Sequence, residues 1–167
     1  MGLASVALIP RAAASDNMAV DRSDAKFIEK AGQGAQQEVT LGTLARNLGA
    51  NQQVRDFGSM MVADHTKELD KVRDLAARKG VDIGPEKHSA RATNTKLAKL
   101  SGVDFDRAYM KDMVEDHRKD LLVFQKMAAE ARDPDVRQFA TDMLPLLQRH
   151  YERAVAVANE VGAKVHG

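Results

Sequence analysis

Two nine-residue stretches of the chain, "MVADHTKEL" at residues 61–69 and "MVEDHRKDL" at residues 113–121, are identical at six positions and lie 52 residues apart. In each of them a methionine, a histidine and a leucine follow one another at intervals of four residues, which places the three side chains on one face of an α-helix. The two stretches therefore predict two helices, each with a histidine in the middle of its apolar face.

The same helical periodicity extends through four long segments. Ser23, Asn51 and Asp133 stand where helix N-caps are expected, and Gly49 and Gly80 stand where helices commonly end. No alternating pattern of a β-strand competes with these signals. We expect helices over residues 23–48, 52–79, 104–131 and 134–161.

The connections between these segments predict how the helices are arranged. The first two are joined by a short turn, as are the last two, so each pair forms an antiparallel hairpin. The connection over residues 80–103 is long enough to return along the whole bundle, and we expect a short helix over residues 86–100 within it. The predicted fold is an all-α, ferritin-like up-down four-helix bundle over residues 23–162, whose second and third helices are parallel because of this long crossover.

The two ends of the chain lie outside the predicted bundle. An apolar run at residues 3–10 is followed by Ala12, Ala13 and Ala14, a pattern that is typical of the end of a secretory signal. We interpret residues 1–22 as a signal-peptide remnant or a disordered tail, and residues 163–167 as a C-terminal tail. The expected location is periplasmic or secreted.

Composition limits the classes of function. The chain has 25 Lys and Arg residues against 24 Asp and Glu residues, and aromatic residues make up only 4% of it, so neither charge nor stacking side chains favour a nucleic-acid partner. It contains no cysteine, which rules out disulfides and thiolate metal sites. No stretch is long and apolar enough to be a transmembrane span. The oligomeric state stays open.

Four metal-ligand side chains are expected at one depth of the bundle core. They are Glu38, His65, His117 and His150, each near the middle of a different helix on its apolar seam. A polar group buried without a partner costs about 1–3 kcal/mol, so four of them at one level need a reason. They either bind a metal or form a hydrogen-bonded polar layer that fixes the register of the helices.

The metal interpretation predicts one divalent ion bound by these four residues. Zinc or iron fits imidazole and carboxylate ligands, and copper is favoured if methionine sulfurs take part. The candidate additional ligands are Glu68, Asp120, Met61 and Met113. The order His65-x-x-Glu68 is the reverse of the Glu-x-x-His motif of di-iron bundles, which argues against di-iron oxidation.

Asp64 and Asp116 precede the two repeated histidines. Either they contact a histidine on a neighbouring helix, or they form ordinary ion pairs near the surface.

The sequence resembles the bacterial domain-of-unknown-function family 4142. The resemblance covers about Ala25 to Ala158 and is carried by the two Met-Val-x-Asp-His blocks, by Glu38-Val39 and by "LPLLQRH", which ends at His150. It implies a ferritin-like bundle that is exported from the cytoplasm, and it implies no activity, substrate or metal.

Three functions remain open on these grounds. The first is an extracytoplasmic metal-binding bundle for storage, sensing or stress protection. The second is a metal-dependent oxidoreductase, and the third is a structural or interaction bundle with a buried histidine layer and no metal.

Overall fold

The computed structural model describes residues 20–85 and 95–165, and these are almost entirely helical. The four long helices are α1 (Arg22–Leu48), α2 (Gln52–Lys79), α4 (Gly102–Glu130) and α5 (Pro134–Glu160). No β-strand occurs in these two ranges, so the expected all-α class is confirmed, and the bounds agree with the sequence to within two residues. No helix in the described part of the chain is long and apolar enough to cross a membrane.

Two of the expectations fall largely or wholly on residues outside the described ranges. The signal-like segment at residues 1–14 is one of them. The short helix expected at residues 86–100 is the other, although residues 95–97, at its end, are helical.

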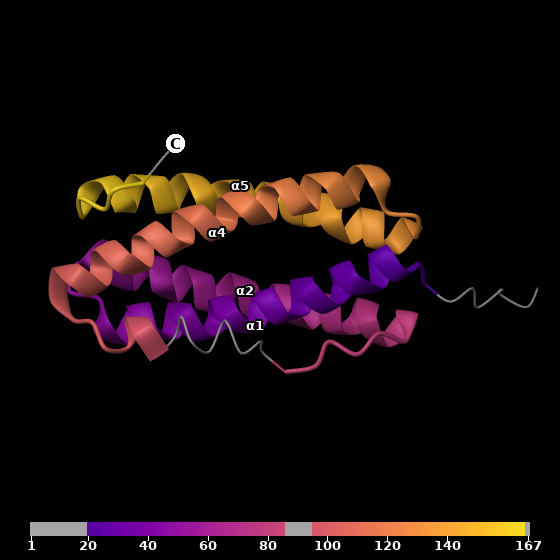
Figure 1. Cartoon of the computed structure of the whole chain (residues 1–167), viewed down its shortest axis with the longest axis horizontal. Helices are drawn as coiled ribbons and strands as arrows, with labels where there is room; N and C mark the ends of the chain where they lie inside the picture. Colours follow the sequence, from indigo (N-terminus) through magenta and orange to yellow (C-terminus); the bar gives the residue numbers. More distant parts are fainter. Residues whose placement is uncertain (1–19, 86–94, 166–167) are drawn as a thin grey trace, which may run out of the picture.

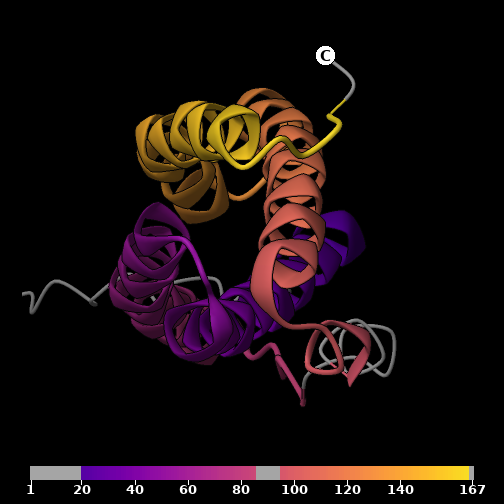
Figure 2. The same ribbon diagram turned by 90° about the vertical axis from the view of Figure 1, so that its left-hand side faces the viewer.

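The helices form two antiparallel hairpins, α1–α2 and α4–α5, which face one another across a common interior (Figures 1 and 2). Helices α2 and α4 run in the same direction (Figure 1). Their N-terminal ends are in contact: the Asp106 carboxylate of α4 accepts hydrogen bonds from the backbone N–H groups of Ala50 and Asn51, just before α2, at 3.0 and 2.8 Å. Both helices therefore begin at the same end of the molecule, as the long connection between them predicts.

The two hairpins repeat each other at an offset of 82 residues. Asp106 of α4 caps the start of α2 through Asn51, and Asp24 of α1 caps the start of α5 through the Asp133 N–H at 2.8 Å. Other matched contacts follow the same offset: Arg55 donates to the carbonyls of Gly49 and Ala50, and Arg137 donates to those of Ala131 and Arg132. This repeat relates α1 to α4 and α2 to α5, whereas the similar nine-residue stretches lie on α2 and α4.

The apolar core is divided into two clusters along the length of the bundle. One contains Phe27, Leu69, Phe124 and Phe139, and the other contains Leu41, Phe57, Met113 and Val157, each among further buried residues. Each long helix contributes residues to both clusters, and on each helix one buried polar residue separates the two sets. These residues are Glu38, His65, His117 and His150. The polar residues thus form a layer between two apolar halves of the core.

Glycines bring α1 and α2 unusually close together. A Cβ atom added at Gly58 would lie 2.6 Å from the Gly42 carbonyl oxygen, and one added at Gly42 would lie 2.7 Å from the Gly58 carbonyl oxygen. Both obstacles are backbone atoms, which cannot rotate away. A larger residue at either position must therefore separate the helices that carry Glu38 and His65.

We predict that Gly58→Ala destabilises the protein. Overpacking costs about 1–3 kcal/mol, and here it exceeds the gain of about 1 kcal/mol in helix propensity. Gly34→Ala is the matched control on α1, because a Cβ atom there has no neighbour within 4 Å, and it should stabilise the helix by about 0.5–1 kcal/mol. Urea denaturation measures both changes. A Gly58→Ala protein as stable as the Gly34→Ala protein would contradict the close approach.

Candidate metal centre

Three histidines from three helices meet at the polar layer. His65 comes from α2, His117 from α4 and His150 from α5, and all three side chains are at most 2% exposed. One ring nitrogen of each lies within 4.8 Å of the corresponding nitrogens of the other two. The ring centres form a nearly equilateral triangle with sides of 5.7, 5.1 and 5.5 Å. We call these three residues the histidine triad.

The other ring nitrogen of each histidine is held by an acceptor. His65 Nδ1 lies 2.6 Å from Glu68 Oε2, and His117 Nδ1 lies 2.9 Å from the Met113 carbonyl oxygen. His150 Nε2 lies 3.2 Å from Asp64 Oδ2. A carbonyl or a carboxylate only accepts hydrogen bonds, so in each neutral imidazole the proton is on the nitrogen that faces its acceptor.

The remaining nitrogens are acceptors without donors. His65 Nε2, His117 Nε2 and His150 Nδ1 are buried and have no hydrogen-bond partner among the described residues. In these tautomers each of the three nitrogens carries a lone pair and no hydrogen. A neutral histidine of the triad therefore cannot donate a hydrogen bond to another histidine of the triad. Buried polar atoms of this kind are costly, and a cation would offset the cost. An imidazole whose far N–H is fixed by a carboxylate or carbonyl is also the usual form of a metal-ligating histidine.

Burial keeps two of the imidazoles neutral at ordinary pH. It lowers the pKa of His117 to about 3, with the charges of His65 and His150 acting in the same direction. It also lowers the pKa of His150 to about 4, against the opposing effect of Asp64. For His65 burial again lowers the pKa, but the hydrogen bond to Glu68 and its charge outweigh this and raise the pKa above its usual value.

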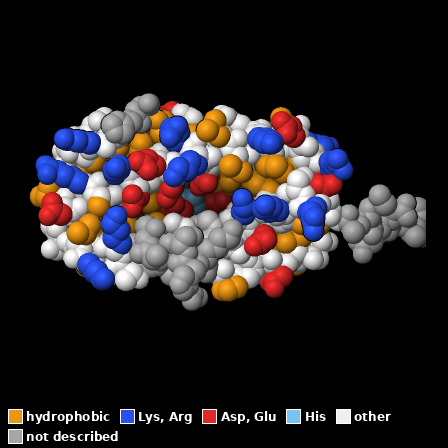
Figure 3. Space-filling model, viewed as in Figure 1, with side chains coloured by type: hydrophobic (Ala, Val, Ile, Leu, Met, Phe, Trp, Pro, Cys, Tyr) orange, Lys and Arg blue, Asp and Glu red, His pale blue; other side chains and the backbone are white. Residues whose placement is uncertain are grey.

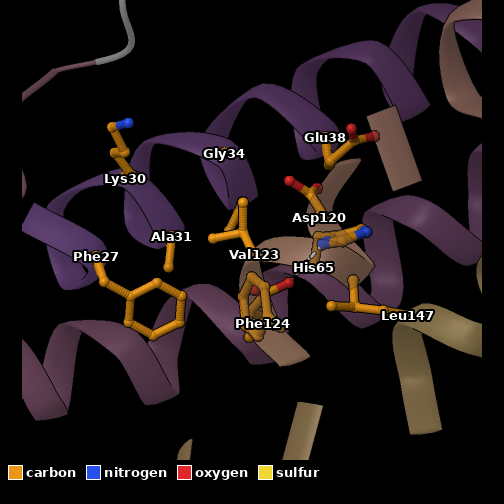
Figure 4. A pocket seen from close by; sticks show the side chains of 12 residues that line it. Phe27, Lys30, Ala31, Gly34, Glu38, His65, Asp120, Val123, Phe124 and Leu147 are labelled. Atoms are coloured by element: carbon orange, nitrogen blue, oxygen red, sulfur yellow. Dashed lines mark hydrogen bonds and ion pairs between the residues drawn. The ribbon is translucent and has the colours of Figure 1, made fainter. Parts of the chain in front are cut away.

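A pocket of about 220 Å³ beside the triad is lined by three carboxylates and His65. The carboxylates come from different helices: Glu38 from α1, Glu68 from α2 and Asp120 from α4. Figure 3 shows acidic side chains gathered at a hollow in the middle of this face, with part of a histidine visible inside it. Glu38, Asp120 and His65 lie together at one end of the pocket, and Phe27 lies at the other (Figure 4). We call Glu38, Glu68 and Asp120 the carboxylate cluster.

Two of these carboxyl groups, those of Glu38 and Asp120, have raised pKa values. Burial raises the pKa of Glu38 to about 8; nearby His65 acts against this rise, while Asp120, Asp116 and Glu68 add to it. Burial also raises the pKa of Asp120 to about 7, with Glu68 and Asp116 acting in the same direction. Burial and the neighbouring negative charges thus act together against ionisation of Glu38 and Asp120.

The predicted ligands thus lie in two adjoining groups. The group with mutual distances within 4.8 Å contains the three histidines but not Glu38, which lines the neighbouring pocket with Asp120. Glu68 lines the same pocket and also binds His65. Met61 and Met113 are buried in an apolar cluster, and Met113 contacts His117 through its carbonyl oxygen.

The two aspartates that precede the repeated histidines differ in role. Asp64 contacts His150 of another helix, as one of the two interpretations expects, while Asp116 pairs with Lys119 on its own helix at 3.3 Å.

The 82-residue repeat was not predicted from the sequence. Glu38 and Asp120 are equivalent positions of the 82-residue repeat, and they face the same pocket from α1 and α4. The signal that reveals this offset is the motif Val-Arg-x-Phe, which occurs at residues 54–57 and again at residues 136–139.

Comparison with known proteins identifies a family and a fold. Residues 9–157 match the model of the family described as "Domain of unknown function (DUF4142)". A search of curated proteins finds no match.

Two solved structures resemble this chain. One is a DUF305 fragment from Deinococcus radiodurans, with a TM-score of 0.75 and 16% identity, covering 86% of this chain and 99% of the other. The second, named "putative secreted protein DUF305" and from Streptomyces coelicolor, has a TM-score of 0.72 and 16% identity, covering 87% and 97%. At this identity the likeness concerns the fold alone.

We predict that Glu38→Gln removes a pH dependence from the metal-free protein. Because the pKa values of Glu38 and Asp120 are raised in the folded state, the folded chain binds more protons than the unfolded chain up to about pH 8, and the free energy of unfolding falls as pH rises through this window. In chelator, the variant should match the wild type at about pH 4 and exceed it by about 2 kcal/mol at about pH 8.5.

The lowered pKa values of His117 and His150 act at the opposite end, where stability falls as pH drops below about 6.5, and Glu38→Gln should leave that part unchanged. Glu130→Gln, at an exposed glutamate of α4, is the control and should follow the wild type throughout. Denaturation curves across the pH range give the comparison. Equal stability of Glu38→Gln and wild type at pH 8.5 would refute the buried, raised-pKa state of Glu38.

Proposed function

The chain belongs to the DUF4142 family, a domain of unknown function, and on that premise we propose that it is an extracytoplasmic metal-binding four-helix bundle of the ferritin-like type. In this proposal His65, His117 and His150 hold one divalent ion in the core. The protein then serves in storage, sensing or stress protection. The ferritin-like assignment is supported by two hairpins joined by a long connection, with α2 and α4 parallel.

The observation that carries the proposal is three unpaired ring nitrogens in a cluster of three buried histidines. In the described part of the chain, His65 Nε2, His117 Nε2 and His150 Nδ1 have no hydrogen-bond partner, and one ring nitrogen of each histidine lies within 4.8 Å of the others. A divalent cation satisfies all three at once, and the outer contacts to Glu68, Met113 and Asp64 already fix the tautomers that ligation requires.

Three imidazoles suit zinc or iron, with copper as the main competitor. A tetrahedral zinc site separates its ligand atoms by about 3.3 Å, so the rings would rotate inward slightly on binding. Three protein ligands leave a fourth position for Glu38 or water. Copper is favoured by the buried residues Met61 and Met113, because thioether sulfur is a soft ligand.

The two competing functions are supported less well. A polar layer without metal should be satisfied by its own hydrogen bonds, yet within residues 20–85 and 95–165 each histidine uses one nitrogen in this way and leaves the other unpaired. A metal-dependent oxidoreductase needs solvent access to the ion. The pocket that reaches His65 would provide such access, so turnover of peroxide or oxygen by the loaded protein is the observation that would favour this second candidate.

An extracytoplasmic location is supported by the apolar run at residues 3–10 and the alanines that follow it, and by the description of the Streptomyces relative as secreted. We predict that the mature protein begins after Ala14 and is exported. Intact-mass analysis of the periplasmic and cytoplasmic fractions of the native host tests this. Finding only the full-length chain, in the cytoplasm, would contradict it.

We predict that metal controls the thermal stability of the protein through the triad. An ion that binds only the folded state stabilises it by about 2.7 kcal/mol at a hundredfold excess over the dissociation constant, so chelator should lower the Tm of the untagged wild type. His117→Leu should lose most of the bound metal and most of the response to chelator. Metal analysis and thermal melts with and without chelator provide the two readouts.

Asp64 and Asp116 offer a matched pair of controls. Asp64→Asn removes the charge that orients His150 and should weaken metal binding about 10- to 100-fold. Asp116→Asn makes the same chemical change at a residue that contacts Lys119 instead, and it should leave the affinity unchanged. Wild-type protein whose Tm responds neither to added metal nor to chelator would exclude the proposed function.

A further inference from the structure

The carboxylate cluster is not explained by the histidine triad. Glu38 and Asp120 lie outside the group of nitrogens that meet within 4.8 Å, although burial and mutual repulsion make their ionised forms unfavourable. Neither residue makes a side-chain ion pair within the described part of the chain. The triad metal alone does not explain why two acidic side chains line one pocket.

Glu38 points to a ligand independently of the acidic character of the pocket. Its side chain is only 4% exposed, and its Oε2 atom is buried without a hydrogen-bond partner in the described residues. The residue lines the pocket together with Glu68, Asp120 and His65. In Figure 4, Lys30, the one lysine or arginine among the described residues that line the pocket, lies at the opposite end from Glu38. The described part of the pocket therefore holds an unpaired Glu38 oxygen with no lysine or arginine beside it.

The repeat of the two hairpins gives the cluster its geometry. Glu38 of α1 and Asp120 of α4 are equivalent positions, 82 residues apart, so they reach the pocket from opposing hairpins. Glu68 of α2 completes the set, while the equivalent of His65 is Leu147, which forms an apolar wall. Carboxylates that line one pocket from three helices suit a hard divalent cation such as Mn²⁺, Fe²⁺ or Mg²⁺.

We propose that Glu38, Glu68 and Asp120 form a second cation site, oxygen-ligated and open to solvent, directly beside the nitrogen-ligated histidine triad. The proposal deepens the proposed function and rests on it in one respect: the triad is taken to bind its own ion without Glu38. Glu68, which binds His65 Nδ1 and also lines the pocket, links the two positions. The protein then holds two ions of different chemical character side by side.

The test uses the full-length chain with zinc in the triad and Mn²⁺ as the probe of the carboxylates. Zinc outcompetes Mn²⁺ at imidazole ligands, so Mn²⁺ does not displace it. After loading with one equivalent of zinc, the wild type should bind one further equivalent of Mn²⁺, measured by the loss of the free-ion signal in electron paramagnetic resonance. The Glu38→Gln/Asp120→Asn variant should retain its zinc and bind Mn²⁺ at least about tenfold more weakly.

The control variant Asp74→Asn/Asp142→Asn removes the same charge from two exposed positions outside the pocket and should bind Mn²⁺ as the wild type does. Equal Mn²⁺ binding by the wild type and the carboxamide variant overturns the proposal. Loss of zinc from the carboxamide variant also overturns it, because Glu38 would then be a ligand of a single site. If the wild type binds no zinc, the proposed function fails, and Mn²⁺ titration of the zinc-free wild type and carboxamide variant still decides the carboxylate site by the same comparison.

Discussion

Three buried imidazoles that meet in the core, each with one ring nitrogen that has no hydrogen-bond partner among the described residues, are the constraint on which the rest of this structure depends. Hydrophobic residues at the same positions would satisfy a four-helix bundle, and the two apolar clusters on either side do so. Maintaining the layer requires Asp64, Glu68 and the Met113 carbonyl to hold the far side of each ring. Unpaired buried nitrogens lower the stability of the fold, and a bound cation would remove that penalty.

The frame that positions this layer is a duplicated helical hairpin. Asp24 and Asp106 each cap the first turn of a helix in the other hairpin, which ties the ends of the bundle together. Between these ends, contact of Gly42 with Gly58 fixes the spacing of α1 and α2. The duplication also explains why Glu38 and Asp120 face one pocket, because equivalent positions of the two hairpins oppose each other across the interior.

Much of this arrangement follows from local sequence rules. Helical periodicity and capping residues predict the four long helices, and the length of the connection between Gly80 and Gly102 predicts that α2 and α4 are parallel. The histidines at the middle of three seams predict that the triad meets at one depth. The position of Glu38 relative to the triad does not follow from these rules. A shift of α1 by one helical turn decides whether the carboxylate joins the imidazoles or lies beside them. The position of α1 against α2 depends in turn on the contact of Gly42 with Gly58. The choice between two roles for Asp64 and Asp116 likewise depends on which neighbouring helix each one faces.

Anomalous diffraction from crystals of the untagged full-length chain, grown with one equivalent of zinc, tests the central claim most directly. The account predicts an anomalous peak in the polar layer, about 2.0–2.1 Å from His65 Nε2, His117 Nε2 and His150 Nδ1. Crystals with no such peak, in which these three nitrogens are paired with ordered water or with one another, would contradict it.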